Sequence, residues 1–76
     1  MKNADYKKAL GLAIRHIRKE RKLTITDLHY ETRINRQSVV KIEQGKVYLR
    51  LDTILRICEA LEVKPAVLFA LADSKP

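Results

Sequence analysis

Four side chains in one short segment combine the types and spacing of a hydrogen-bonding helix face. Placed on a helix, residues 36–44 bring Arg36, Gln37, Val40 and Lys41 onto one arc. Arg and Lys donate hydrogen bonds to O6 and N7 of guanine, Gln pairs with adenine, and an apolar side chain contacts the thymine methyl group. This chemistry suits a helix in the major groove of DNA. The alternative is an ordinary solvated helix surface, because Arg, Gln and Lys are common helix residues.

Two short helices joined by a tight turn would hold this face. Thr24 is a preferred N-cap residue and Asp27 follows three residues later, which predicts a helix over residues 25–32. Asn35 is a second N-cap residue and Gly45 is a stop signal, which predicts a helix over residues 36–44. The residues expected to pack inward are Ile25, Leu28, Ile34, Ser38, Val39 and Ile42.

Three more helices complete the predicted fold, over residues 4–21, over residues 51–61 and from Pro65 onward. The first has an apolar stripe (Leu10, Ile14, Ile17) and a basic stripe (Arg15, Arg18, Lys19, Lys22) on different sides. The second is expected to turn Leu51, Ile54, Cys58 and Leu61 inward. We therefore expect an all-α fold, a single compact five-helix domain over residues 1–76 with a core of about 6–72 and short flexible ends.

The net charge is +7, and the basic residues are concentrated in the first two-thirds of the chain. Residues 1–22 hold eight Lys or Arg against two acids, residues 23–50 hold five against three, and residues 51–76 hold three against four. Such a basic pole favours a polyanion as partner, nucleic acid before a membrane. A solvated surface and a cationic helix lying on a membrane are the alternatives. No apolar run approaches the ~18 residues of a membrane span.

Nothing in the sequence favours catalysis. Cys58 is the only cysteine, so no intrachain disulfide is possible, which suits a reducing cytoplasm. His16 and His29 have no neighbouring Cys or carboxylate cluster of the kind that binds metals. Ser38 and Ser74 lack the flanks of a nucleophile elbow. We expect neither an enzyme nor a metal or other cofactor.

The order and spacing of these residues resemble the Cro/repressor family of helix-turn-helix regulators, also called Xre-type or lambda-repressor-like domains. The resemblance covers about residues 10–69. It rests on Arg18, Leu23-Thr24, Leu28, residues 34–39 (INRQSV), KIEQGK at 41–46, LDTILRICEALEV at 51–63 and LF at 68–69. It implies a lambda-repressor-like domain in which a central helix-turn-helix binds double-stranded DNA.

The resemblance also implies roles for particular residues. The four residues on the arc described above fall at positions that face base edges. Arg18 and Glu43 fall where family members often form a partly buried ion pair between the first and third helices. The residues expected to contact phosphate are Lys22, Thr24, Thr26, Arg33, Gln44, Lys46, Tyr48 and Arg50.

Three residues depart from the family pattern. Ile25 replaces a frequent Gln that supports the first recognition-helix side chain and bonds phosphate. Isoleucine can do neither, so Thr24 and Thr26 are expected to hold the DNA backbone instead. His29 replaces a small residue, so its ring must tilt outward or widen the helix crossing. Arg33 replaces a Gly that often has positive φ, at a cost of about 1 kcal/mol.

The last helix predicts a homodimer. Its apolar residues exceed what one side of a helix needs to close the core, and Val67, Leu68 and Leu71 are expected to form the interface. A two-fold dimer would place two recognition helices about 34 Å apart on a pseudo-palindrome. The alternative is that this helix only closes a small core.

The leading hypothesis is a sequence-specific DNA-binding transcriptional regulator. It would resemble phage or plasmid repressors and restriction–modification controllers, acting in the cytoplasm and at the nucleoid when bound to DNA. Two alternatives are open: a DNA-binding antitoxin of a toxin–antitoxin pair, and a protein-interaction module that has lost DNA binding, for which Ile25 and His29 are the best evidence. A polymerase or a toxin is the protein partner to consider.

Overall fold

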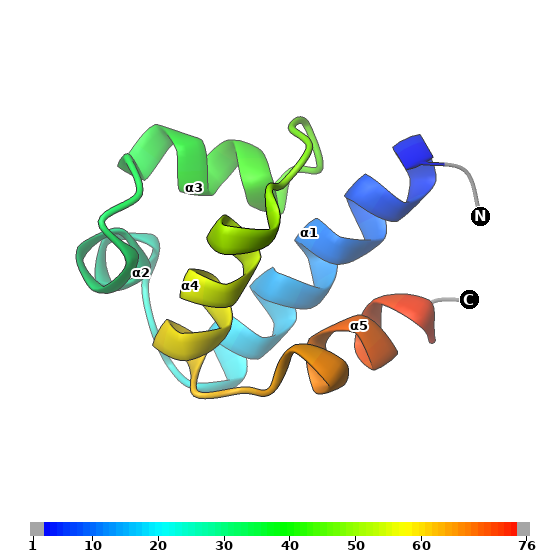
Figure 1. The fold of residues 1–76 in the computed structure, drawn as a ribbon. Helices are drawn as coiled ribbons and strands as arrows, with labels where there is room; N and C mark the ends of the chain where they lie inside the picture. The colour runs from blue at the N-terminus through cyan, green and yellow to red at the C-terminus, as the bar shows by residue number, and fades with distance from the viewer. Residues whose placement is uncertain (1–2, 75–76) are drawn as a thin grey trace.

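The computed structural model describes residues 3–74, and these residues form five helices (Figure 1). The helices are α1 (Asn3–Glu20), α2 (Ile25–Thr32), α3 (Arg36–Glu43), α4 (Leu51–Leu61) and α5 (Pro65–Asp73). The predicted all-α fold with five helices is confirmed, and the predicted helix bounds agree to within one residue. The predicted flexible ends include residues 1–2 and 75–76, which lie outside the described part of the chain.

Each helix stops where its sequence supplies a left-handed residue or a cap. Gly45 follows α3 with φ 72°, and the N–H of Lys46 reaches back to the carbonyl of Lys41 at 3.0 Å. Lys22, Arg33 and Glu62 take positive φ near the ends of α1, α2 and α4. Non-glycine residues adopt this conformation at a free-energy cost. Three of the four helix ends that lead into another helix therefore store some strain.

The core lies between α1 and the four shorter helices. Its fully buried large side chains are Ile14, Leu28, Val39, Ile57, Leu61 and Leu68. Ile57 occupies the inward side of α4, and Leu51, which was predicted to face inward, is 67% exposed. The buried side of α4 is centred on Ile54, Ile57 and Leu61. Leu51 therefore lies at the edge of the buried stripe, where it meets solvent.

Gly11 allows α1 and α3 to cross closely. A Cβ at this position would collide with the carbonyl oxygen of Ile42 and lie 2.9 Å from that of Glu43. Glycine in a helix interior costs about 1 kcal/mol relative to alanine, so its presence here indicates that close packing is required. α3 is thereby held directly against α1.

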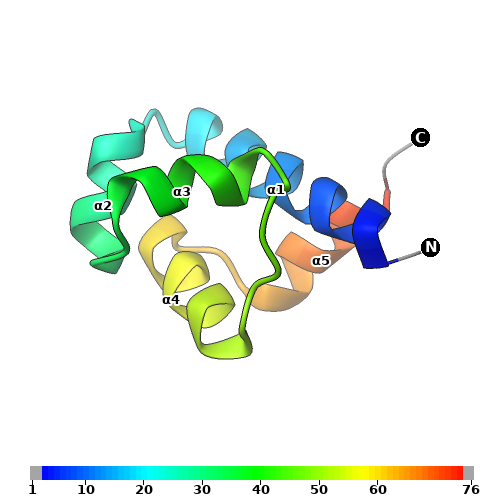
Figure 2. The ribbon, with the colours of Figure 1, turned by 90° about the horizontal axis from the view of Figure 1, so that it is seen from above.

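The start of α1 and the end of α5 lie on the same side of the molecule in both ribbon views (Figures 1 and 2). α2 and the N-terminal end of α3 lie at the opposite side. Packing between α1 and α5 brings the two ends together, and the rings of Tyr6 and Phe69 stack there with centroids 6.3 Å apart.

Candidate nucleic-acid interface

The turn between α2 and α3 is held by hydrogen bonds in place of a glycine. Arg33 has φ 62° and ψ 18°, the left-handed conformation expected at this position. Thr32 Oγ1 donates to the carbonyl of Leu28 at 2.7 Å and accepts from the N–H of Ile34 at 3.2 Å. Arg56 of α4 donates to the carbonyl of Thr32 at 3.1 Å. These three hydrogen bonds therefore hold the turn between α2 and α3 in place.

His29 braces the same turn. Its Nδ1 lies 2.6 Å from the carbonyl oxygen of Ile34, so the tautomer protonated at Nδ1 donates a hydrogen bond there. The ring is half-buried, with its centroid 5.0 Å from that of Tyr30. The half-buried ring of His29 therefore contributes a polar contact to the α2–α3 turn.

The four predicted base-reading residues lie on the outward side of α3. Arg36, Gln37 and Lys41 are exposed, and Val40 is half-buried. Asn35 caps the helix by accepting from the N–H of Gln37 at 2.9 Å. Figure 2 looks down on this helix, which runs along the near face of the molecule with α2 at one end. The structure thus brings the four side chains onto one accessible face, and their contact with bases remains a prediction.

Ser38 was predicted to face inward, and this prediction is wrong. Ser38 is exposed, whereas Glu43 is buried together with Val39 and Ile42. The stripe that faces the core is therefore rotated toward Glu43, because that carboxylate has a buried partner. The hydroxyl of Ser38 joins the outward face beside Lys41 and adds a donor and acceptor that the sequence did not suggest.

Thr26 supports the first residue of the recognition helix. Arg36 Nε donates to Thr26 Oγ1 at 3.3 Å, so α2 holds the guanidinium of α3 in place. Ile25, at the start of α2, packs against the core and remains partly exposed. This contact between Thr26 and Arg36 was not predicted from the sequence, and the contact of Thr26 with phosphate stays a prediction. Ile25 is partly buried against the core and His29 bonds the α2–α3 turn, so the fold accommodates both departures from the family pattern.

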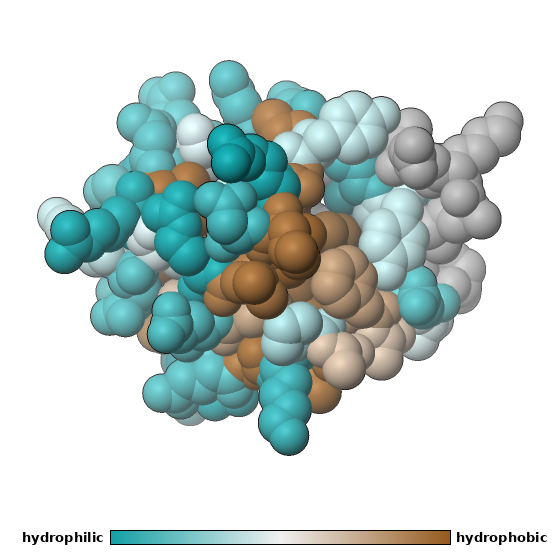
Figure 3. Space-filling view, viewed as in Figure 1, coloured by the Kyte–Doolittle hydropathy of each residue, from teal (hydrophilic) through white to brown (hydrophobic). Residues whose placement is uncertain are grey.

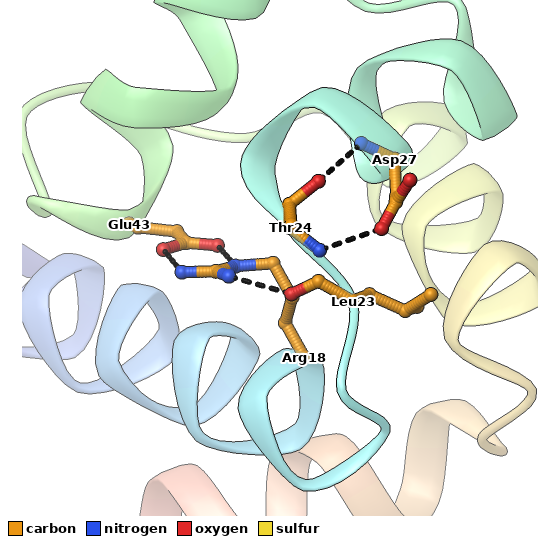
Figure 4. Close-up of polar contacts among 5 residues, drawn as sticks. All are labelled: Arg18, Leu23, Thr24, Asp27 and Glu43. Carbon is orange, nitrogen blue, oxygen red and sulfur yellow. Dashed lines mark hydrogen bonds and ion pairs between the residues drawn. The ribbon is translucent and has the colours of Figure 1, made fainter.

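Arg18 and Glu43 form the expected ion pair between α1 and α3 (Figure 4). Arg18 Nε donates to Glu43 Oε2 at 2.6 Å, and Arg18 Nη2 donates to Oε1 at 3.0 Å. In a third hydrogen bond, Arg18 Nη1 donates to the carbonyl of Leu23 at 2.8 Å.

Thr24 and Asp27 form a capping box beside the ion pair (Figure 4). Thr24 Oγ1 accepts from the N–H of Asp27 at 3.0 Å, and the Asp27 carboxylate accepts from the N–H of Thr24 at 2.8 Å. This capping box fixes the start of α2.

The predicted phosphate-contacting residues are all exposed, and they lie in different surroundings. The set is Lys22, Thr24, Thr26, Arg33, Gln44, Lys46, Tyr48 and Arg50. Lys7 Nζ lies 4.1 Å from the centroid of the Tyr48 ring. Arg50 Nε lies 3.4 Å from Asp52 Oδ1, which offsets part of its charge. The contacts of these residues with phosphate stay a prediction.

Two basic residues of α1 belong to the same surface. Lys8 and Arg15 line a groove of about 440 Å³ together with Val40 and Gln44 of α3. Arg15 belongs to the basic stripe predicted for this helix, whereas Lys8 was not predicted to be part of the surface. Its signal is the helical spacing, since Lys8 precedes Arg15 by seven residues and therefore lies on the same side of α1.

The predicted dimer interface needs correction at Leu68. This side chain is fully buried in the core of the monomer, so it cannot contact a partner. Val67 is 52% exposed and Leu71 is partly exposed. In Figure 3 an apolar surface extends over α4 and α5. The exposed large apolar residues of these two helices are Leu51, Leu55 and Val67.

No helix within residues 3–74 has the length and apolar character of a membrane span. Over the same part of the chain, no group of three or more His, Cys, Asp or Glu residues is arranged to hold a metal ion.

The sequence matches the model of the Cro/C1-type HTH DNA-binding domain over residues 13–74. No curated protein matches the chain significantly. Among solved structures, the clp gene regulator ClgR from Corynebacterium glutamicum has a TM-score of 0.87 and 24% identity, over 90% of this chain and 88% of that chain.

Two restriction–modification controller proteins are also similar. C.AhdI from Aeromonas hydrophila has a TM-score of 0.79 and 27% identity, over 82% of this chain and 94% of that chain. C.Esp1396I, solved as a tetramer in complex with its natural 35 base-pair operator, has a TM-score of 0.83 and 26% identity, over 90% of each chain.

Proposed function

Because this chain belongs to the Cro/C1-type helix-turn-helix DNA-binding family, we propose that it is a sequence-specific transcriptional regulator that binds double-stranded DNA as a homodimer. The observation that carries the proposal is the outward face of α3, where Arg36, Gln37 and Lys41 are exposed on a helix fixed at both ends. A helix of this kind fits the major groove, and these side chains match the donor and acceptor patterns of base edges.

The class of regulator we propose is a restriction–modification controller or a phage or plasmid repressor. The two similar controller proteins support the first of these, since each resembles this chain over more than four-fifths of its length. The proposal places the protein in the cytoplasm, at the nucleoid when bound, and assigns it no catalytic step.

Most of the affinity would come from the backbone of the DNA. Lys8, Arg15 and Lys46 are exposed cations, and neutralising a phosphate releases a condensed counterion. Arg36 and its neighbours would then select the sequence, because base contacts specify and phosphate contacts position.

Selection of bound sites from a random duplex library tests the proposal. We expect one recovered motif with two related half-sites about one helical turn apart. Arg36→Ala or Gln37→Ala should cost about 1–3 kcal/mol on the recovered site and relax the preference at one position.

Lys46→Ala is the matched control for these variants. It should weaken cognate and random duplexes by the same factor, because a phosphate contact carries no sequence information. Equal losses on cognate and random DNA for Arg36→Ala and Gln37→Ala would contradict the proposal.

A further inference from the structure

A groove beside the recognition helix has an apolar centre. Ile25 from the start of α2, Val40 from α3 and Leu12 from α1 line it together, and all three are at least partly exposed. Three helices therefore contribute one apolar side chain each to a hollow that opens on the face of α3. Ile25 stands where related domains often have a polar Gln.

The two charged side chains on the floor of this groove are bonded to each other. Arg18 and Glu43 line it, but each is committed to the other, and the remaining Arg18 nitrogen bonds the carbonyl of Leu23. Within residues 3–74 no buried side-chain nitrogen or oxygen lacks a partner. A ligand entering the groove would therefore meet apolar contacts at its centre.

The rim of the groove is cationic. Lys8 and Arg15 are exposed there, and neither forms an ion pair with any residue that the structure describes. Gln44 completes the lining on the side of α3. A polyanion with an apolar group at its edge fits this combination. In the major groove of DNA, the apolar group at a base edge is the C5-methyl of a pyrimidine.

We propose that Ile25 and Val40 form a slot that reads a pyrimidine C5-methyl group, with Ile25 as the residue that determines this preference. Lys8 and Arg15 hold the flanking phosphates and so bring the base edge to the slot. The methyl group can belong to thymine or to 5-methylcytosine. The inference rests on the proposed function, because it requires α3 to lie in the major groove.

Duplexes that differ by one methyl group test the slot. The duplex recovered by library selection is synthesised with deoxyuridine in place of each thymidine in turn, and with 5-methylcytosine in place of each cytosine in turn. If thymine is the source, one deoxyuridine substitution per half-site lowers the affinity about fourfold, the effect of removing one buried methyl group. If 5-methylcytosine is the source, one cytosine methylation raises the affinity by a similar factor.

Ile25→Ala identifies the side chain that senses the methyl group. We expect the ratio of affinities for the methylated and unmethylated duplex to fall close to one in this variant. A loss of folded protein would lower both affinities equally and leave the ratio unchanged, so the ratio separates recognition from stability. Tyr30→Ala is the matched control, because Tyr30 is a 73% exposed side chain of α2 outside the groove.

Two outcomes would overturn the inference. One is that no single methyl group changes the affinity of the unaltered protein. The other is that the methyl ratio stays the same in Ile25→Ala. If selection recovers a motif and either outcome follows, the proposed function stands and the slot fails; if selection recovers no motif, the proposed function itself fails.

Discussion

Arg18 is among the few charged side chains buried in the described part of the chain, and each of its three guanidinium nitrogens donates a hydrogen bond. Its side chain is 9% exposed and that of Glu43 is 6% exposed. Removing one member of such a pair leaves the other charge buried without compensation, which costs more than the pair contributes. The pair also joins α1 to α3, so its loss would loosen the helix that carries the reading face.

We expect Arg18→Met to lower the free energy of unfolding by about 3–5 kcal/mol. The double variant Arg18→Met with Glu43→Leu should recover most of this loss, because no charge is then stranded. Urea denaturation of the three proteins measures both effects. A loss below about 1 kcal/mol for the single variant would mean that the pair behaves as a solvated surface pair.

Cys58 provides a test of the packed core. Burial raises the pKa of the Cys58 thiol, so less thiolate is present near neutral pH than for a free cysteine. Alkylation by iodoacetamide should therefore be slow in the native protein and fast in denaturant. Because the folded state favours the protonated thiol, stability should fall as pH rises through and above the ordinary thiol pKa. Equal alkylation rates with and without denaturant would contradict this burial.

At the scale of elements, the sequence located the helices better than it oriented them. Thr24, Asn35 and Gly45 are local signals, since each satisfies or ends the helix beside it, and they predicted α2 and α3 to within one residue. Which side of a helix is buried depends on its neighbours in space. Ser38 and Leu51 were therefore assigned to the core wrongly, at the edges of correctly placed helices.

The residues of the candidate site could be predicted from the sequence, but the contacts between its helices could not. The residues of the reading face follow from the spacing of α3. The contact between Arg36 and Thr26 and the groove that includes Ile25 depend on how α1, α2 and α3 meet. Gly11 is the residue that permits this meeting, and its only sequence signal is a glycine inside a helical segment.

Two residues with positive φ at helix ends, Arg33 and Glu62, give a pair of predictions. Arg33→Gly should raise the free energy of unfolding by about 1 kcal/mol, because glycine adopts φ 62° without the cost that Arg pays. It should also weaken DNA binding, since an exposed cation beside α3 is lost. Thermal unfolding and a duplex-binding titration measure the two effects.

Glu62→Gly is the matched control for the α2–α3 turn. Glu62 has φ 56° at the end of α4, beside Arg21, so the same relief of strain is expected there. Glu62 is not part of the reading face, so DNA affinity should be unchanged or slightly higher. A stability gain without loss of affinity for Arg33→Gly would remove Arg33 from the set of phosphate contacts.

For the whole molecule, the apolar surface over α4 and α5 is the feature that a monomer does not explain. Leu51, Leu55 and Val67 are 67%, 46% and 52% exposed. Exposed apolar patches of this kind mark association surfaces. A small domain also gains stability by oligomerising, since it buries a modest share of its surface alone.

We expect Leu55→Glu to convert a dimer to a monomer, because two like charges would then meet across a two-fold interface. Sedimentation velocity in the analytical ultracentrifuge measures the oligomeric state directly. Tyr30→Glu, an exposed position on α2, should leave the state unchanged. If the unaltered protein sediments as a monomer at all concentrations tested, the homodimer proposal is wrong.

The neighbouring positions of the start of α1 and the end of α5 have a practical consequence for protein engineering. A short flexible linker can join the two ends of the described chain, which permits a circular permutant. The same arrangement lets a fluorescent or affinity module be attached at either end while the opposite side of the molecule stays uncovered.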